Sequence, residues 1–368
     1  RGYFVAEQVL AISNHPTFMG GGEYSYLDLI AHLPEKYPVI ASLPSEDLLA
    51  ARIREKGIPT VIIPLAPINP TCIFKMVNAI RQIKDVCKMR NIHLIYANGS
   101  RAAFYGGLAG RLCSIPVIWH CRVSEADPYL DFILLRLVNR IVANSQATAS
   151  RFSSRYQNKI DKVYNGIALK WFRDEEIQRP SFIENDWVVI LVVARVSKLK
   201  RHDLILSAFE KVALDDKNIH LICVGGKDHS EPDWWNELQE KTKRSPFSDR
   251  VHWIGSVDDI RPWYRGASVM VLSSSNESFG RVVVEAMASG VPVIATRSGG
   301  IPEIVTHMQN GMLVPENDSE AIASAIVRIL HDSDLKERIR EEGLKHAEIF
   351  SIDVHIENML RIFDQALN

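Results

Sequence analysis

Two glutamates, eight positions apart, are the residues of this sequence with the clearest chemical potential. Glu277 and Glu285 lie in the segment Ser274–Gly290, where a Ser-Phe-Gly turn separates Glu277 from a helical pattern that ends at Gly290. The residues before this segment are apolar and β-branched, which is typical of a buried strand. A helix that starts after a strand presents unpaired N–H groups and the positive end of its dipole, so it binds phosphates readily. Because a carboxylate repels a phosphate, we expect the glutamates to hold sugar hydroxyls instead.

A basic loop follows another apolar run, Trp187–Ala194. Directly before a helical pattern it carries four cations, namely Arg195, Lys198, Lys200 and Arg201. Arginine can clamp two phosphate oxygens, and lysine supplies a point charge. Such a loop is suited to a diphosphate, and the alternative is a solvated basic loop. The loop that carries Glu277, the acidic loop, lies in the same half of the chain and favours the diphosphate.

A run of three glycines, Gly20, Gly21 and Gly22, lies between the first predicted strand and the first predicted helix. Glycines allow a ligand to approach the backbone closely, and the alternative is a flexible turn. The run matches neither the P-loop nor the dinucleotide fingerprint. Glu23 is interpreted as a helix cap.

His120 lies at the end of a predicted strand, facing the expected cleft. The alternative to a functional histidine there is a structural one that is hydrogen-bonded to its neighbours.

The elements that must position these residues alternate between strand and helix, which predicts parallel sheets covered by helices. A chain of 368 residues is too long for one core, so we expect two doubly wound α/β domains. The expected domains are residues 1–167, with the helix 351–368 crossing back to them, and residues 168–350. We expect them to face each other across a cleft, with ligands at the carboxyl ends of the strands.

The predicted strands of the first half are Val9–Ser13, Tyr37–Ser42, Pro59–Pro64, Ile92–Ala97, Pro116–His120 and Asn139–Asn144. Those of the second half are Trp187–Ala194, His220–Gly225, Arg250–Gly255, Ser268–Ser274 and Pro292–Thr296. The last predicted helix, Ser351–Leu367, has one apolar face formed by Ile352, Ile356, Leu360, Phe363 and Leu367.

The composition excludes several classes of protein. With 43 basic and 44 acidic residues, the net charge of −1 provides no general attraction for nucleic acid. Five scattered cysteines indicate reduced thiols, and we expect a cytoplasmic protein. The start of the sequence has no apolar signal core, and no apolar stretch is long enough to span a bilayer. The amphipathic, cationic pattern of Cys72–Arg90 suggests a contact with the inner face of a membrane, and the alternative is a core-facing helix.

Several segments together resemble the retaining glycosyltransferases of family 4, which have the two-domain GT-B fold. The segment from Glu277 to Val305 is similar to the family signature, and Ala194–Phe209 is similar to its basic loop, with Arg195 and Lys200 at the matching spacing. Asn144–Phe152 and Val163–Phe172 resemble interdomain segments, and the glycine run resembles the glycine loop of the first domain.

The resemblance implies roles for individual residues. Glu285 would hold the ribose hydroxyls of a nucleotide sugar, and Glu277 would touch the transferred sugar. The turn and helix start around these glutamates would approach the sugar and the diphosphate, and this donor-binding stretch consists of Ser278, Phe279, Gly280, Arg281 and Val282.

Further roles follow from the same resemblance. Arg195 and Lys200 would neutralise the diphosphate leaving group. Gly21 and Gly22 would lie near the donor phosphate and the acceptor, and His120 would lie near the reacting sugar. Preorganised cations would stabilise the departing diphosphate without a general acid, a metal or another cofactor. The co-substrate would be a nucleotide-diphosphate sugar, with a UDP-sugar favoured over a GDP- or ADP-sugar, and the acceptor a glycan, a lipid-linked molecule or a small molecule.

The chain departs from the family pattern around the donor. Ala194 and Arg201 stand where the basic loop usually has glycines, and Arg281 stands where an aliphatic residue is common. The segment Val224–Asp228 lacks the usual Gly-x-Gly form. Two other functions are compatible with the same residues: a GT-B epimerase or phosphorylase, and a nucleotide-sugar-binding protein without activity.

Overall fold

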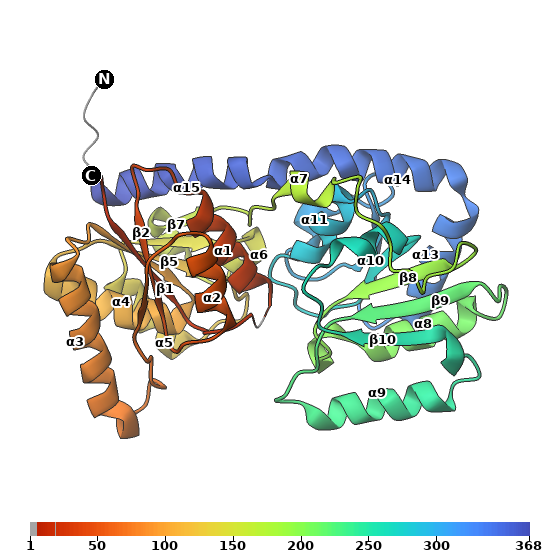
Figure 1. Cartoon of the computed structure of the whole chain (residues 1–368), viewed down its shortest axis with the longest axis horizontal. Coiled ribbons are helices and arrows are strands. Elements are labelled where there is room, and N and C mark those ends of the chain that lie inside the picture. The colour runs from red at the N-terminus through yellow and green to blue at the C-terminus, as the bar shows by residue number, and fades with distance from the viewer. Residues whose placement is uncertain (1–5, 19) are drawn as a thin grey trace. The chain divides into compact units, whose positions relative to one another are not determined.

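The computed structural model describes residues 6–18 and 20–368. The chain divides into two compact units, one formed by residues up to Ile167 together with Ser351–Asn368, and the other by Ala168–Phe350. Each unit contains a parallel sheet with helices packed against it (Figure 1). The predicted fold class of two doubly wound α/β domains is confirmed.

The described part of the first unit has a seven-stranded sheet in the order β3-β2-β1-β4-β5-β6-β7. Its strands are β1 (Val9–Ser13), β2 (Val39–Leu43), β3 (Thr60–Ile62), β4 (Leu94–Asn98), β5 (Val117–Cys121), β6 (Arg140–Ala143) and β7 (Ile160–Lys162). Its helices are α1 (Gly21–His32), α2 (Leu48–Glu55), α3 (Ile73–Met89), α4 (Ser100–Cys113), α5 (Pro128–Leu137), α6 (Gln146–Ala149) and α15 (Ile352–Leu367).

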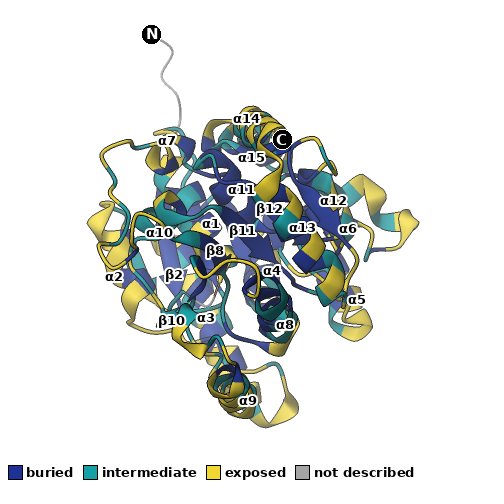
Figure 2. Cartoon of the chain, turned by 90° about the vertical axis from the view of Figure 1, so that its right-hand side faces the viewer, coloured by how far each residue is buried: buried dark blue, intermediate teal, exposed yellow. Residues whose placement is uncertain are grey.

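The second unit has a six-stranded sheet in the order β10-β9-β8-β11-β12-β13. Its strands are β8 (Val188–Val193), β9 (Ile219–Val224), β10 (Val251–Gly255), β11 (Val269–Leu272), β12 (Val293–Thr296) and β13 (Met312–Val314). Its helices are α7 (Leu169–Phe172), α8 (His202–Val212), α9 (Pro232–Arg244), α10 (Arg261–Gly266), α11 (Arg281–Ala288), α12 (Ile301–Ile304), α13 (Ser319–His331) and α14 (Ser333–His346). The central strands β8, β11 and β12 are buried, whereas α9 is largely exposed (Figure 2).

The strand order reverses once in each sheet, between β1 and β4 in the first unit and between β8 and β11 in the second. Doubly wound sheets bind ligands where the order reverses, because the loops after the two strands there turn to opposite faces of the sheet. In the second unit these are the basic loop after β8 and the acidic loop after β11. The topology therefore brings together the two loops that the sequence singles out.

The last helix, α15, lies beside α1 of the first unit (Figure 1) and also packs against β4. The predicted apolar face packs on the first unit: Ile352 and Phe363 are buried, and Ile356, Leu360 and Leu367 are half-buried against the core. A prediction from the spacing of apolar residues alone missed His355, which is also buried. The buried residues are Ile352, His355, Met359, Ile362 and Phe363.

Two strands were not predicted, β7 and β13. Each has three residues, and a segment this short shows no periodicity in the sequence. β7 reads Ile-Asp-Lys and lies at the edge of its sheet, where a charged strand is tolerated. All five cysteines are free, and Cys87, Cys121 and Cys223 are buried.

Candidate active site

The basic and acidic loops of the second unit are joined by hydrogen bonds. The N–H of Ser275 donates to the carbonyl of Leu199 over 2.9 Å. The hydroxyl of Ser273 donates to the carbonyls of Lys200 and Arg201, over 2.8 and 3.0 Å. These bonds hold the backbone of Lys200 against the start of the acidic loop.

Lys200 and Glu277 form an ion pair across the two loops. The Nζ of Lys200 lies 2.5 Å from Oε2 of Glu277, and the two side chains are 20% and 14% exposed. The strength of such a pair increases as water is excluded. The structure therefore brings together two of the residues predicted to act on neighbouring parts of one ligand, a cation for the diphosphate and a carboxylate for sugar hydroxyls.

Arg195 lies on the same loop, and its Nε is 3.3 Å from Oδ2 of Asp228, which follows β9. Hydrogen bonds from Ser230 lower the pKa of Asp228, and the charge of Arg195 lowers it further. Because the side chain of Arg195 is 39% exposed, its guanidinium remains accessible to a ligand. Asp228 was not predicted to belong to the site.

The turn before α11 requires glycine. Gly280 has a φ of 96°, a conformation that residues with a side chain rarely adopt. A Cβ at this position would lie 2.4 Å from Cδ1 of Ile301. Gly280 also stands at the N-terminus of α11, where it has no side chain that could cap the helix. This turn therefore depends on glycine, and the close approach of a donor to its backbone stays a prediction.

The loop Ser298–Gly300, for which no role was predicted, holds the acidic loop in place through hydrogen bonds. Gly300 donates its N–H to the carbonyl of Glu277 over 2.8 Å, and Asn276 donates its N–H to Oγ of Ser298 over 2.5 Å. Gly299 has a φ of 52°, and a Cβ there would lie 1.9 Å from the Glu277 carbonyl oxygen. The Ser-Gly-Gly run directly after a predicted strand could have indicated that this loop approaches another backbone closely.

Glu285 is held at both of its oxygens. Arg281 donates from Nε to Oε1 over 2.7 Å, and the hydroxyl of Tyr264 donates to Oε2 over 3.1 Å. A carboxylate oxygen has two lone pairs, so each can still accept from a ligand hydroxyl. Burial and the nearby charge of Glu285 raise the pKa of Tyr264 well above its usual value, so the phenol remains a donor. Tyr264 was not predicted.

The remaining donor-binding residues of the prediction contribute backbone and packing. The ring of Phe279 is buried and packs edge-on against Phe350, with the centroids 5.7 Å apart. The carbonyl of Val282 accepts a bond from Tyr264 over 3.3 Å. Ser278 is half-buried at the turn. The structure thus places the side chain of Phe279 in the core, and any contact with a donor falls to its backbone.

In the first unit, the glycine run leads directly into α1. Gly21 is the first residue of this helix, and Gly20 donates its N–H to Oε2 of Glu23 over 3.1 Å. The interpretation of Glu23 as a helix cap is therefore confirmed. A Cβ on Gly22 would lie 3.3 Å from Cδ of Arg122, so this glycine makes room for an arginine from the loop after β5.

His120 is fully buried at the end of β5. Its Nδ1 lies 2.7 Å from the hydroxyl of Tyr96, whereas its Nε2 has no hydrogen-bond partner in the described part of the chain. Burial lowers the pKa of His120 well below its usual value, and the charges of Arg122 and His355 lower it further. None of these three neighbours was predicted, and His355 comes from α15, far along the chain.

His202 is a buried polar residue directly after the basic loop, and both of its ring nitrogens lack a partner in the described residues. Burial, with a smaller effect of Lys200, lowers its pKa to about 4. An unfolded chain has a histidine pKa of about 6.5, so it takes up a proton that the folded chain does not. Above about pH 6.5 this histidine is neutral in both states and has no such effect. As the pH falls from about 6.5 toward 4, only the unfolded chain is protonated at this position, so the free energy of unfolding decreases.

His202→Leu is therefore expected to raise the melting temperature at pH 5 more than at pH 7.5, and to make its dependence on pH shallower. Melting temperatures measured across about pH 5 to 8 test this. His331→Leu, at an exposed position of α13, is the control. Parallel melting curves for His202→Leu and the unaltered chain at every pH would contradict the assignment.

No group of three or more histidine, cysteine or acidic side chains that could hold a metal ion occurs in the described residues. Within the same residues, no helix combines the length and the apolar character that crossing a membrane requires.

Two known protein families match the sequence of this chain. The family model described as glycosyl transferases group 1 matches residues 173–346, and the model of glycosyltransferase family 4 matches residues 19–171. Together the two matches span most of the chain. The chain belongs to the group 1, family 4 glycosyltransferases.

Curated relatives of this glycosyltransferase include the D-inositol 3-phosphate glycosyltransferase of Streptomyces avermitilis, which is 29% identical over 248 residues, or 64% of this chain and 53% of the relative. Another is the N-acetyl-alpha-D-glucosaminyl L-malate synthase of Bacillus anthracis, which is 31% identical over 187 residues, or 50% of this chain and 48% of the relative. The chain thus matches about half the length of these relatives.

Solved structures resemble this glycosyltransferase over almost its whole length. HepE of Anabaena, in complex with UDP and glucose, has a TM-score of 0.84 and 21% identity, and the match covers 96% of this chain and 99% of HepE. A glycosyltransferase from Rickettsia africae has a TM-score of 0.85 and 21% identity, with 99% of each chain covered. These similarities establish the GT-B fold.

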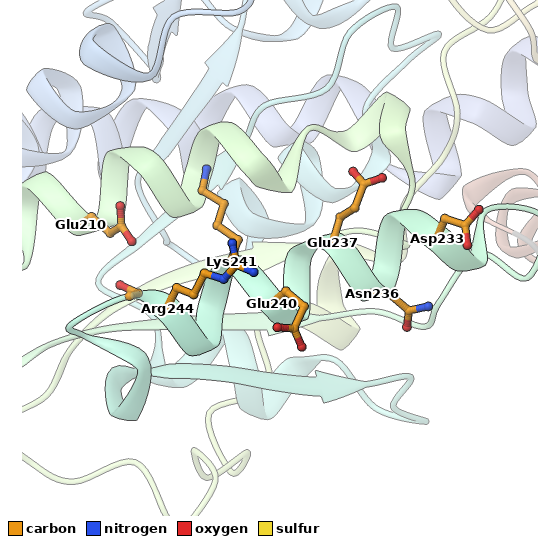
Figure 3. A pocket seen from close by; sticks show the side chains of 8 residues that line it. Glu210, Asp233, Asn236, Glu237, Glu240, Lys241 and Arg244 are labelled. Atoms are coloured by element: carbon orange, nitrogen blue, oxygen red, sulfur yellow. The ribbon is translucent and has the colours of Figure 1, made fainter.

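A surface hollow of about 710 Å³ lies between α8 and α9 of the glycosyltransferase (Figure 3). Lys241 joins the two helices there, because its Nζ donates to the carbonyl of Asp203 over 2.9 Å and to the hydroxyl of Ser207 over 2.7 Å. None of the residues predicted to bind the donor lines the hollow, so we assign it to helix packing. Its lining consists of Glu210, Asp233, Asn236, Glu237, Glu240, Lys241, Arg244 and Ser245.

Proposed function

We propose that this protein transfers a sugar from a nucleotide-diphosphate sugar to a hydroxyl of an acceptor, with retention of configuration at the transferred carbon. The second unit would bind the donor, with Glu285 on the ribose and Glu277 on the sugar. Arg195 and Lys200 would neutralise the diphosphate as it leaves. Because two cations are available to the leaving group, we propose that transfer needs neither a divalent metal nor another cofactor.

The observation that carries this proposal is the Lys200–Glu277 ion pair at the point where the strand order of the second unit reverses. A donor that enters there would exchange one ion pair for two contacts, a phosphate on Lys200 and a sugar hydroxyl on Glu277. Both are charge-assisted hydrogen bonds, which are stronger than neutral ones. Until a ligand replaces this contact, the ion pair keeps each of the two partly buried charges next to a charge of opposite sign.

Donor screening tests the proposal. UDP is tried first, because the structurally similar HepE has been solved with UDP and glucose, and GDP and ADP follow. A bound nucleotide is expected to raise the melting temperature of the protein. Release of the nucleotide diphosphate is then measured with each donor sugar against a panel of glycan, lipid-linked and small-molecule acceptors, in the presence and absence of EDTA.

The product decides between the possible reactions. NMR of the product anomer should show retained configuration, and EDTA should leave the rate unchanged. An inverted anomer would contradict the retaining mechanism, and conversion of the donor to an isomeric donor without an acceptor would identify an epimerase instead. Binding without turnover across the whole panel would identify a non-catalytic binding protein.

We further propose that α3 contacts an anionic membrane surface. The first two turns of this helix expose apolar side chains, with Phe74 88% and Val77 47% exposed. Cations on the same helix accompany them at Lys75, Arg81 and Lys88, all exposed. An apolar tip flanked by cations is complementary to anionic lipid. The opposite face, which packs on the core, consists of Met76, Ala79, Ile83 and Cys87.

Sedimentation with phospholipid vesicles tests this contact. The protein is expected to bind phosphatidylglycerol vesicles at low salt, to bind them less at high salt, and not to bind phosphatidylcholine vesicles. Phe74→Ser should weaken the binding, because it removes the apolar tip. Met89→Ser, which changes a 74% exposed residue at the other end of α3, is the control. Equal binding by Phe74→Ser and the unaltered chain would refute the proposal.

A further inference from the structure

The first unit contains a buried polar network around His120. Arg122 donates from Nε to Oδ1 of Asn98 over 2.6 Å, and from Nη1 to Oδ1 of Asn165. Its Nη2 donates to the hydroxyl of Tyr96 over 3.2 Å and lies 3.4 Å from Nδ1 of His120. The amides of the two asparagines thus fix the plane of the guanidinium, and its third nitrogen faces the tyrosine and the histidine.

Arg122 determines which nitrogen of the imidazole carries the proton. A guanidinium can only donate, so the Tyr96 oxygen accepts from it and the single phenolic proton is directed elsewhere. A bare Nδ1 of His120 accepts that proton over 2.7 Å. A proton on Nδ1 would instead face the N–H groups of Arg122. The neutral ring must therefore carry its proton on Nε2, the nitrogen that has no partner in the described residues.

We propose that Arg122, acting with Tyr96, is a positioning residue that fixes His120 as the neutral tautomer protonated at Nε2. The inference rests on the proposed glycosyl transfer for its meaning, since it makes the histidine a hydrogen-bond donor to the transferred sugar. The tautomer also restricts the chemistry that His120 can perform. In this tautomer Nδ1 is engaged by Tyr96 and Nε2 already carries the proton, so the neutral ring has no bare nitrogen to act as a general base. Its Nε2–H is too weak an acid to act as a general acid, so His120 orients the sugar.

The groups that face His120 all act in the same direction. Tyr96 reaches it from β4, Arg122 from the loop after β5, and His355 from α15, with the centroids of the two histidine rings 6.2 Å apart. The first donates a proton to the ring, the second is a fixed cation, and the third would add positive charge if protonated. None of them stabilises an imidazolium, and the ring is fully buried.

Nitrogen NMR of the protein labelled with ¹⁵N-histidine tests the tautomer without any substrate. A bare ring nitrogen and a protonated one resonate in well-separated ranges, and the pattern of couplings to the ring protons tells Nδ1 from Nε2. The signals of His120 are those that disappear in His120→Gln. We expect Nδ1 to be bare and Nε2 protonated, unchanged between about pH 5 and pH 8. A proton on Nδ1, or a titration in this range, would overturn the proposal.

Two variants test the cause. In Arg122→Met and in Tyr96→Phe we expect a mixture of tautomers at His120 or a titration that moves into the range of about pH 5 to 8. Tyr105→Phe is the matched control, because Tyr105 is equally buried in the same unit and its hydroxyl donates to the carbonyl of Ala66 over 2.8 Å, away from His120. If Arg122→Met does not fold, Tyr96→Phe alone decides. An unchanged tautomer in a folded Tyr96→Phe protein would overturn the role of the network.

Activity separates this inference from the proposed function. If donor screening finds transfer, kcat of the unaltered protein should show no ionisation near pH 6.5, whereas kcat of Tyr96→Phe should acquire one. A wild-type profile that follows a histidine titration would refute the fixed tautomer. Absence of transfer with every donor would refute the proposed function, and the NMR result would still stand on its own.

Discussion

Lys200→Ala is expected to lower kcat about 100- to 1,000-fold, the usual cost of removing one preorganised group that stabilises transition-state charge. The side chain of Lys200 is 80% covered and pairs directly with Glu277, so its charge is held in one place beside that carboxylate. The substitution also leaves the Glu277 carboxylate beside the departing diphosphate, where it repels the developing charge. Initial rates of nucleotide-diphosphate release at saturating donor measure the effect.

Lys211→Ala is the matched control for this substitution. Lys211 belongs to the same unit and also pairs with a glutamate, Glu320, but it does so at the surface of α8 and α13. Its replacement should leave kcat unchanged. The double variant Lys200→Ala with Glu277→Gln should be more stable than Lys200→Ala alone, because no unpaired charge remains, and should regain no activity. A kcat within a factor of two of the unaltered protein in Lys200→Ala would remove Lys200 from the proposed mechanism.

Gly299→Ala is expected to abolish measurable transfer and to lower the melting temperature of the second unit. A left-handed backbone costs a residue with a side chain roughly 1–2 kcal/mol. The larger effect is steric, because the new Cβ would lie 1.9 Å from the carbonyl oxygen of Glu277. The acidic loop would have to move, and the carboxylate of Glu277 would move with it.

The control for Gly299→Ala separates backbone strain from collision. Gly57 has a φ of 75°, similarly left-handed, and a Cβ there meets nothing within 4 Å. Gly57→Ala should therefore show a small loss of stability and full activity. Melting curves and rates measured for both variants below their transitions make the comparison. Equal activity in Gly299→Ala and Gly57→Ala would mean that the placement of the Glu277 loop does not limit the reaction.

The sequence was sufficient to predict the fold and the loops of the second unit, because these depend on local signals. Apolar runs such as Trp187–Ala194 and the left-handed stop at Gly290 identify a strand and a helix end within a few residues. Arg195 and Lys200, which were predicted to act together, lie on one loop, directly after β8. The roles of the predicted site residues stay predictions, since no bound ligand tests them.

The partners that hold these residues could not be predicted, because they come from distant parts of the chain. Tyr264 reaches Glu285 from another helix, and Asp228 reaches Arg195 from the loop after another strand. His355 is separated from His120 by the whole second unit, and its polar side chain gave no reason to place it in a core. A single sequence shows which residue types are present, whereas such pairings appear only when the chain is folded.

The docking of α15 on the first unit has a consequence for synthesis on the ribosome. The chain returns to this unit where Ile167 pairs with Ser351, and Phe363 then packs edge-on against Tyr37, with the ring centroids 5.4 Å apart. Domains fold as they emerge, with the amino-terminal part first. The first unit therefore waits, without its final helix, until the entire second unit has been translated. A chain released before α15 is translated lacks Phe363, which packs on Tyr96, and His355, which lies beside His120. The two histidines therefore come together only after α15 has been synthesised.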